Sequence, residues 1–176
     1  MTTPERATSV AQAGNNLGGK YLTFALKEET YAVDVRKVRE IIRMTNITRV
    51  PQMPDFVRGV INLRGKIIPV VDLRLRFGFS DPSITEHTCI VVVQIQIGTS
   101  LRRETGLVVD SVEEVLNLTP QEIEETPDFG TEVDTRYLLG VAKSKGLVKL
   151  LLDLDRILAP EEAEALSLSE AAGTSL

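Results

Sequence analysis

The sequence predicts a mainly β protein built from two small barrels of the SH3-like kind, with a few short helices. Three observations favour this fold class. A block of glycine, valine, aspartate and leucine occurs twice at the same spacing, strand-like apolar runs fill the middle of the chain, and a glycine marks a chain reversal inside each block. A duplicated β unit of this size is more typical of two barrels than of one sandwich.

The repeated block is a Gly-Val pair, a glycine six positions after the first, and an Asp-Leu pair seven positions further on. Its two copies are Gly59-Val60, Gly65 and Asp72-Leu73, and then Gly140-Val141, Gly146 and Asp153-Leu154. Each copy is typical of a strand, a tight turn, a second strand and the start of a helix. Aspartate at that last position predicts a helix cap. A pair of catalytic carboxylates is the less favoured alternative, because the sequence nearby supplies no second reactive group.

The segments predicted before the first block are two strands, a helical or irregular turn, and a third strand. They comprise the strands 21–27 and 30–34, the helical or irregular turn 34–43, and the strand 47–50. The helical assignment rests on Val35, Val38 and Ile42, which would share one side of a helix. Pro51 and Pro54 then predict an extended connection.

Between and after the blocks, the pattern predicts three more strand or hairpin segments and two helices. The segments are a long strand over 88–97, a polar hairpin over 98–104 and a returning strand over 105–110. Thr119, Pro120 and Glu122 predict a short helix, since they supply a cap, a proline at the first helical position and a glutamate three residues after the cap. Residues 160–168 predict a terminal helix.

Composition argues against several classes of function. With 176 residues, of which 43% are hydrophobic, the chain can bury a core that the two barrels share. The net charge of −5 argues against nucleic acid as the main partner, because binding phosphates needs a basic excess. No apolar run is long enough to span a membrane or to serve as an export signal, and Cys89 is the only cysteine. A cytoplasmic location is the simplest expectation.

An enzyme is the rival class of function, and its candidate residues are few. The phosphate-binding loops GxxxxGK[ST] and GxGxxG and the nucleophile motif GxSxG are missing, so no cofactor is expected. His87 and Cys89 are two positions apart, which on a strand places them on one face, where they could activate a nucleophile or begin a zinc site. They are the only histidine and the only cysteine in the chain, so ordinary strand residues are the favoured interpretation and no metal is expected.

Arg64, at the tip of the first predicted hairpin, is open to two interpretations. An exposed arginine adds little stability, so it is either simply solvated or it binds an acidic partner. Its counterpart in the second copy is Lys145, next to Gly146. The residues alone do not decide between the two.

The run from Gly59 to Arg74, GVINLRGKIIPVVDLR, closely resembles the hallmark of CheW-like proteins, the coupling proteins of bacterial chemotaxis. The segments 31–41, 48–51 and 106–110 fit the same family, and the resemblance covers residues 20–158. It implies two five-stranded SH3-like barrels packed on a shared hydrophobic core. The first would be formed mainly by residues 20–80 and the second mainly by 88–153, with the possibility that strands are exchanged. Residues 1–19 are then expected to be a disordered arm, and 159–176 a terminal helix and frayed tail.

The resemblance also implies a function: a non-catalytic adaptor that bridges the cytoplasmic tip of chemoreceptors to the regulatory domain of the histidine kinase CheA. A CheW-like adaptor in another pathway, such as surface motility, is the alternative within the family. The receptor- or kinase-binding positions that it implies are Val38, Glu40, Ile47, Gly59, Asn62, Arg64, Cys89, Ile90 and Val115. Among these, Arg64 is expected to pair with Glu40, whereas Lys145 is left without a matching motif.

Overall fold

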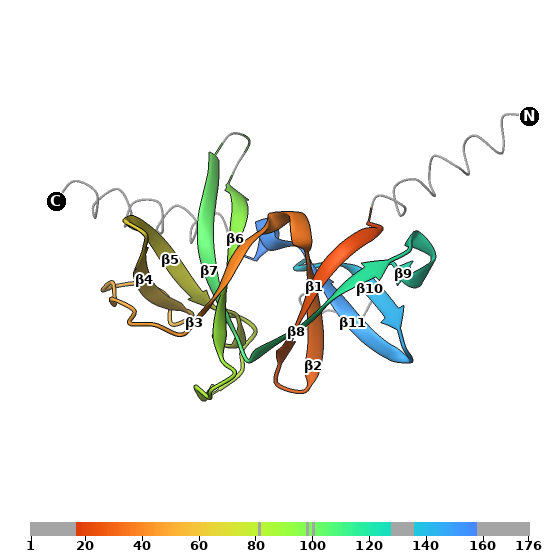
Figure 1. The fold of residues 1–176 in the computed structure, drawn as a ribbon, viewed down its shortest axis with the longest axis horizontal. Coiled ribbons are helices and arrows are strands. Elements are labelled where there is room, and N and C mark those ends of the chain that lie inside the picture. Colours follow the sequence, from red (N-terminus) through yellow and green to blue (C-terminus); the bar gives the residue numbers. More distant parts are fainter. Residues whose placement is uncertain (1–16, 81, 98, 100, 128–135, 158–176) are drawn as a thin grey trace, which may run out of the picture.

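The computed structural model describes residues 17–80, 82–97, 99, 101–127 and 136–157, and its strands form two sheets that lie side by side (Figure 1). The first sheet has the order β3-β6-β7-β5-β4, and the second has the order β8-β1-β2-β11-β10-β9. The strands are β1 (Gly19–Leu26), β2 (Glu29–Asp34), β3 (Val38–Arg43), β4 (Val57–Leu63), β5 (Lys66–Asp72), β6 (Cys89–Ile97), β7 (Leu101–Val109), β8 (Ser111–Leu118), β9 (Ile123–Glu124), β10 (Leu138–Ser144) and β11 (Leu147–Leu152). The predicted pair of SH3-like barrels is confirmed, and the second barrel gains the short sixth strand β9.

The two barrels do not follow one another along the chain. All strands of the first sheet lie between Val38 and Val109, so we call it the inserted barrel. The second sheet takes β1 and β2 from before that segment and β8 to β11 from after it, so we call it the split barrel. The first sequence copy therefore contributes its opening hairpin, β1–β2, to the split barrel, which contains the second repeated block. The second copy contributes its opening hairpin, β6–β7, to the inserted barrel, which contains the first block. A simple division into residues 20–80 and 88–153 does not describe the barrels, because the opening hairpins are exchanged.

The exchange explains the long apolar runs, because strands with two buried faces serve two cores. In β6, Ile90 and Val92 point into the inserted barrel, whereas Val91, Val93 and Ile95 belong to a cluster shared by both barrels. That shared cluster also contains Leu22, Phe24, Leu26, Tyr31 and Val33 from β1 and β2. A third cluster, around Tyr21, Leu116 and Leu151, fills the split barrel. Separating the barrels would expose the shared cluster, so they form one folding unit.

The two glycines that begin the repeated blocks allow another segment to approach closely. Gly59 has φ +139°, and a Cβ placed there would lie 2.0 Å from the carbonyl oxygen of Thr48, which bridges to Val60. A Cβ on Gly140 would lie 2.8 Å from the carbonyl oxygen of Glu124, at the end of β9. In both copies, therefore, the glycine leaves room for a crossing backbone.

The two aspartates that close the blocks are helix caps, as predicted. Asp72 accepts a hydrogen bond from the backbone N–H of Arg74 and begins α2 (Leu73–Arg76). Asp153 accepts one from the backbone N–H of Asp155 and begins η3 (Leu154–Arg156). The predicted helix after Thr119 is also present, as the single 3₁₀ turn η2 (Pro120–Glu122) with a capping box.

Some predicted elements were wrong. The segment 34–43 is helical only in η1 (Val35–Lys37), and β3 follows, with partly buried and exposed residues alternating. The three apolar residues matched a helical spacing, but pairing with β6 decides the conformation. The segment 47–50 forms one isolated bridge at Thr48 rather than a strand. The return strand β7 begins at Leu101, so residues 101–104, which were predicted as part of the hairpin, belong to the strand. The predicted helix over 160–168 lies outside the described residues.

Candidate functional site

The tip of the β4–β5 hairpin is held in one conformation by its own backbone. Arg64 has φ 53° and Gly65 has φ 86°, which is the geometry of a tight two-residue turn. The side chain of Asn62 accepts a hydrogen bond from the backbone N–H of Gly65, at 2.8 Å. This contact fixes the turn, so the position of Arg64 at the tip is set by the fold.

Arg64 contacts an acidic residue of its own chain. Its Nη2 lies 2.5 Å from Oε2 of Glu40 on β3, as the resemblance led us to expect. The arginine side chain is 73% exposed and that of Glu40 only 26%. The hydrogen bond and the charge of Glu40 raise the pKa of the Arg64 guanidinium. The other carboxylate oxygen of Glu40, Oε1, is buried without a hydrogen-bond partner among the described residues, so the carboxylate depends strongly on Arg64.

Strand β3 places apolar residues on both sides of Glu40. Val38 packs against the shared cluster. Ile41, which sequence reasoning missed, is 45% exposed. The sequence VREIIR does not alternate apolar and polar residues, so it carried no strand signal; as a strand paired with β6, the segment turns Ile41 to the side opposite Glu40.

The segment after β3 and the start of β4 are joined through Gly59. Ile47 packs against the cluster inside the inserted barrel. Its neighbour Thr48 accepts a hydrogen bond from the backbone N–H of Val60 at 2.8 Å and donates one to the carbonyl of Val60 at 2.9 Å. The contribution of Gly59 to this region is thus the space that it leaves for Thr48.

Cys89 and Ile90 begin β6 and lie on opposite faces of it. Ile90 is fully buried inside the inserted barrel, so its side chain is not available to a partner. Cys89 is partly buried beside the shared cluster and opposite Arg43 of β3. Burial raises the pKa of its thiol, against a smaller opposite effect from a backbone hydrogen bond with Val112. A raised pKa disfavours the thiolate that a nucleophile would need.

Val115 is the one candidate position in the split barrel. It lies on β8, opposite Leu22 of β1, and is 53% exposed. The structure therefore brings Glu40, Asn62 and Arg64 together, turns Val38 on the same strand toward the shared cluster, and leaves Val115 on the other barrel.

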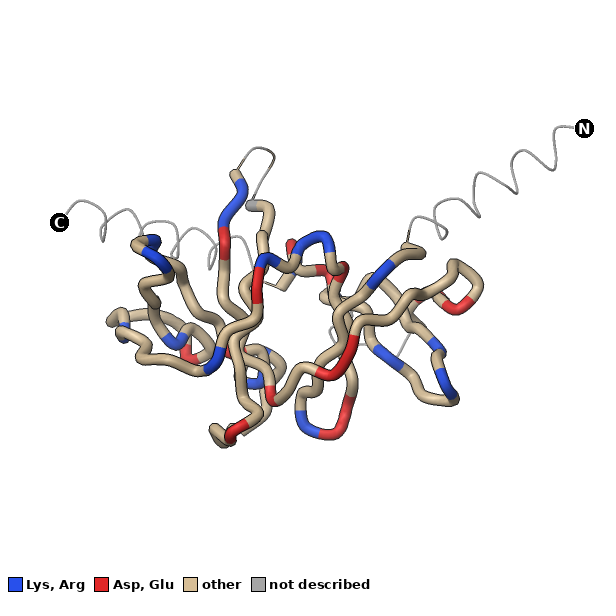
Figure 2. Tube along the Cα trace, viewed as in Figure 1, with Lys and Arg blue, Asp and Glu red and all other residues tan. Residues whose placement is uncertain are grey.

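The split barrel has its own version of the hairpin contact, which corrects the expectation that Lys145 has no counterpart motif. Lys145 has φ 55° and its Nζ lies 3.4 Å from Oε1 of Glu114 on β8. In each barrel, then, a basic residue at the hairpin tip contacts a glutamate on the strand that pairs with the exchanged hairpin. Charges of both signs occur on both barrels (Figure 2).

The β10–β11 hairpin also exposes apolar residues that sequence reasoning did not single out. Leu147 is 63% exposed, Val148 53% and Leu139 36%. Lys66 and Ile67 take the places of Leu147 and Val148 in the first copy. We call Leu147 and Val148, which follow the turn directly, the apolar tip of the split barrel; Leu139 lies at the other end of β10, beside the pair of Leu138 with Leu152. Comparing the two aligned copies position by position would have found it.

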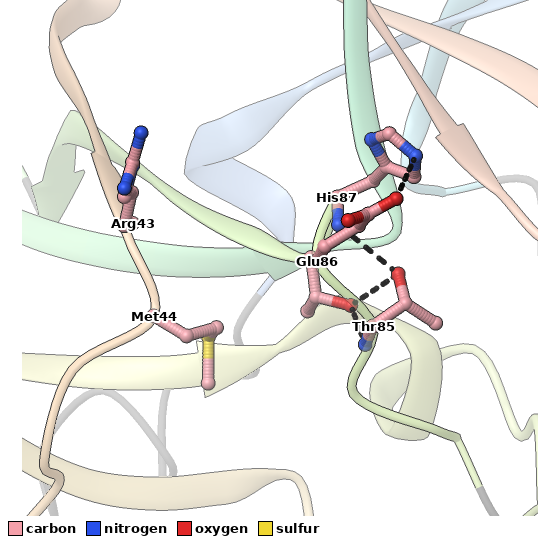
Figure 3. Close-up of a pocket in the computed structure, with 6 residues that line it drawn as sticks. Arg43, Met44, Thr85, Glu86 and His87 are labelled. Carbon is pink, nitrogen blue, oxygen red and sulfur yellow. Dashed lines mark hydrogen bonds and ion pairs between the residues drawn. The ribbon is translucent and has the colours of Figure 1, made fainter.

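The enzyme candidates do not assemble into a reactive group. His87 precedes β6, and it borders an open pocket with Arg43 and Met44 on the opposite side (Figure 3). Its Nε2 lies 3.4 Å from Oε1 of the exposed Glu86. Among the described residues, no three side chains of the metal-binding types are grouped closely enough to hold an ion. No helix in the described part of the chain has the length and hydropathy needed to cross a membrane.

Comparisons with known proteins agree with this architecture. The CheW-like domain matches residues 20–162. Chemotaxis protein CheW of Klebsiella aerogenes is 37% identical over 156 residues, covering 89% of this chain and 91% of that protein. Chemotaxis protein CheW of Rhizobium meliloti is 33% identical over 158 residues, covering 90% and 99%. The crystal structure of the scaffolding protein TtCheW from Thermoanaerobacter tengcongensis superposes with a TM-score of 0.72 at 35% identity, covering 83% of this chain and 97% of that one. The chain belongs to the CheW-like domain family.

Proposed function

We propose that the protein is a non-catalytic chemotaxis adaptor that couples the cytoplasmic tip of chemoreceptors to the regulatory domain of the histidine kinase CheA. Membership of the CheW-like family and similarity to a scaffolding protein support an adaptor role. The observation that carries the proposal is the Glu40–Arg64 pair, held on a fixed hairpin tip in the inserted barrel. An exposed pair of this kind adds little stability, about 0–1 kcal/mol, so binding is a better reason for its rigid placement.

The receptor-facing surface that we propose lies where β3 and β8 border the shared cluster. Val38 and Cys89 of the inserted barrel and Val112 of the split barrel all pack on that cluster. Ile41 and Val115 extend the apolar surface outward, because both are exposed. An apolar surface between two barrels suits a receptor helix with anchors at helical spacing. Arg64 and Glu40 lie on the other face of β3 from Ile41, and because β3 is an edge strand, a helix bound to Ile41 would meet their charges across the free edge of the sheet.

The kinase-facing surface that we propose is the apolar tip of the split barrel. Leu147 and Val148 are exposed next to the turn of one hairpin, and exposed large apolar side chains are typical of interfaces. The basic residues Lys143 and Lys145 adjoin them and would form a charged rim. The two surfaces use different strands and adjoin where Lys145 contacts Glu114, next to Val115, and the adaptor would be recruited with the kinase to membrane-bound receptors.

Such an adaptor changes kinase activity only if its contacts differ between signalling states. No chemistry in this chain is required for that. Binding alone suffices when one partner's state changes the affinity for the other.

The testing experiment replaces the hairpin arginine and measures assembly of the ternary complex. Arg64→Glu places a negative charge beside Glu40, so we expect weaker assembly with receptor and kinase while the protein stays folded. The double variant Glu40→Arg with Arg64→Glu restores the pair in the opposite orientation. If it restores assembly, the pair itself is required; if only wild type assembles, the positive charge at the tip is required. Unchanged pull-downs with a folded Arg64→Glu variant would show that the proposed site is wrong.

A further inference from the structure

Two ionic contacts lie where the chain crosses between the barrels. The chain passes from the split to the inserted barrel through η1, and returns through Asp110 between β7 and β8. At the return crossing, Asp110 contacts Arg74 of α2; at the first crossing, Lys37 contacts Asp155 of η3. Arg74 and Asp155 occupy the same place in the two copies, two residues after the capping aspartate. The contacts therefore share one equivalent position in the internal repeat, at which the charge is opposite; their other partners differ, because the repeat matches Asp110 with Asp34 rather than with Lys37.

The contact at Asp110 is multiply bonded, and its arginine is buried. Arg74 Nη1 lies 3.0 Å from Asp110 Oδ1, and the side chains of Arg74 and Asp110 are 2% and 31% exposed. Arg74 also donates to both oxygens of Asp72, at 3.0 and 2.9 Å. The other oxygen of Asp110 accepts a hydrogen bond of 2.6 Å from the backbone N–H of Lys27, in the β1–β2 turn of the split barrel. Two charged hydrogen bonds on Asp110, from Arg74 and from Lys27, thus join the barrels at this point, and the bonds to Asp72 hold Arg74 in place.

The contact at Asp155 is exposed and simpler. Lys37 Nζ lies 2.8 Å from Asp155 Oδ2, and the two side chains are 37% and 35% exposed. Asp155 Oδ1 accepts a hydrogen bond of 2.8 Å from the backbone N–H of Gln96, in β6 of the inserted barrel. A single lysine that reaches water is held weakly and is screened by salt. The orange and blue segments that carry this contact lie between the sheets in Figure 1.

We propose that the two contacts form an asymmetric device: the Asp110 contact is a fixed pivot, and the Lys37–Asp155 contact is a latch that opens. When the latch opens, the barrels rotate slightly about the pivot, and the spacing between β3 and β8 changes. The separation of Ile41 from Val115 then changes with it. This rotation depends only on the contacts between the two barrels, so we expect it whichever partner binds.

The test measures the distance between the barrels with two spin labels. Cysteines replace Lys66 on β5 and Asn117 on β8, both exposed, in a Cys89→Val background. At low salt, Lys37→Met should broaden or displace the distance distribution, and Lys37→Arg should restore it. In about 1 M salt, where the Debye length falls to about 3 Å, the parent protein should approach the Lys37→Met distribution.

Two further variants separate the latch from general effects. Lys143→Met removes an exposed ion pair with Glu124 that lies within the split barrel, and should leave the distribution unchanged. Asp110→Asn keeps an acceptor for Lys27 but loses the charge that faces Arg74, so it should displace the distribution at low and high salt alike. Thermal unfolding checks that each variant is folded. If Asp110→Asn does not fold, the distance distributions of the Lys37 variants test the proposal on their own. An unchanged distribution in Lys37→Met, or equal broadening in Lys143→Met, would overturn the proposal.

Discussion

The two copies of the repeated block have the same backbone and different electrostatics. In the first copy, Asp72 is fully buried and pairs with Arg74 and Arg58. In the second copy, the equivalent Asp153 contacts Arg156 at 3.4 Å, and the arginine is 68% exposed. The capping hydrogen bond and the preceding strand are common to both. The difference teaches that the duplication maintains the architecture, whereas each barrel has acquired its own charges.

The largest expected difference between the copies concerns these aspartates. Asp72→Asn removes the negative charge that two arginines share, and breaking a buried pair typically costs about 3–5 kcal/mol. Asp153→Asn keeps a capping side chain and loses only an exposed pair, so its cost should stay below about 1 kcal/mol. Chemical denaturation of both variants measures the free energies of unfolding. Equal losses of unfolding free energy in the two variants would show that burial of Asp72 with its two arginines does not add to stability.

The next largest difference in stability is expected between the two glycines that begin the repeated blocks. Gly59→Ala would place a Cβ 2.0 Å from a backbone oxygen at φ +139°, where an alanine is strained. Gly140→Ala would place it at 2.8 Å. We expect a loss of about 3 kcal/mol or more for Gly59→Ala and about 1–3 kcal/mol for Gly140→Ala, from overpacking and backbone strain. Thermal unfolding gives the order, and a larger loss at Gly140 would contradict the close approach seen at Thr48.

Acid should weaken the first copy more than the second. Burial alone would raise the pKa of Asp72, but hydrogen bonds from Arg74 and Arg58 outweigh it and hold that pKa below its ordinary value. A lowered pKa in the folded state adds stability above the unfolded value of about 3.9, and this is lost as pH falls toward the folded pKa. The free energy of unfolding of the parent should therefore fall between about pH 5 and pH 2 more steeply than that of Asp72→Asn. If the free energies of unfolding of the parent and of Asp72→Asn fell equally steeply with pH, this role of Asp72 would be contradicted.

The smallest effect on stability is expected at the hairpin tips. Arg64→Ala and Lys145→Ala each remove an exposed contact with a glutamate, worth about 0–1 kcal/mol. Arg64→Ala should cost slightly more, because it leaves Glu40 partly buried and unpaired. Melting temperatures of the two variants test this, and a large loss in either would mean that the tip is structural rather than functional.

The sequence predicted the barrels, the hairpin tips and the aspartate caps because these depend on local patterns. The Gly59 and Gly140 blocks carry their own turn and cap residues, so short-range rules suffice. The conformation of residues 38–43 could not be predicted in this way, since pairing with β6 decides it. The exchange of hairpins was anticipated only as a possibility that the resemblance implies, because it depends on long-range pairings such as that of β2 with β11.

Much of the candidate site came from the family resemblance rather than from single-residue chemistry. The Glu40–Arg64 contact joins residues 24 positions apart, and only the fold shows that they meet. Ile41 and the apolar tip were missed because exposure depends on which strand face is covered. Ile90 looked like a contact residue, yet the fold buries it completely.

The central claim is that the inserted barrel's hairpin tip serves binding, and the paired charge-reversal variants test it most directly. Arg64→Glu and Lys145→Glu are compared by titrating receptor tip fragments and the kinase regulatory domain separately. We predict that Arg64→Glu weakens receptor-dependent assembly at least tenfold, with thermal stability near that of the parent, and that Lys145→Glu leaves binding to the receptor fragment unchanged. Equal receptor affinity for the parent and a folded Arg64→Glu variant would contradict the account.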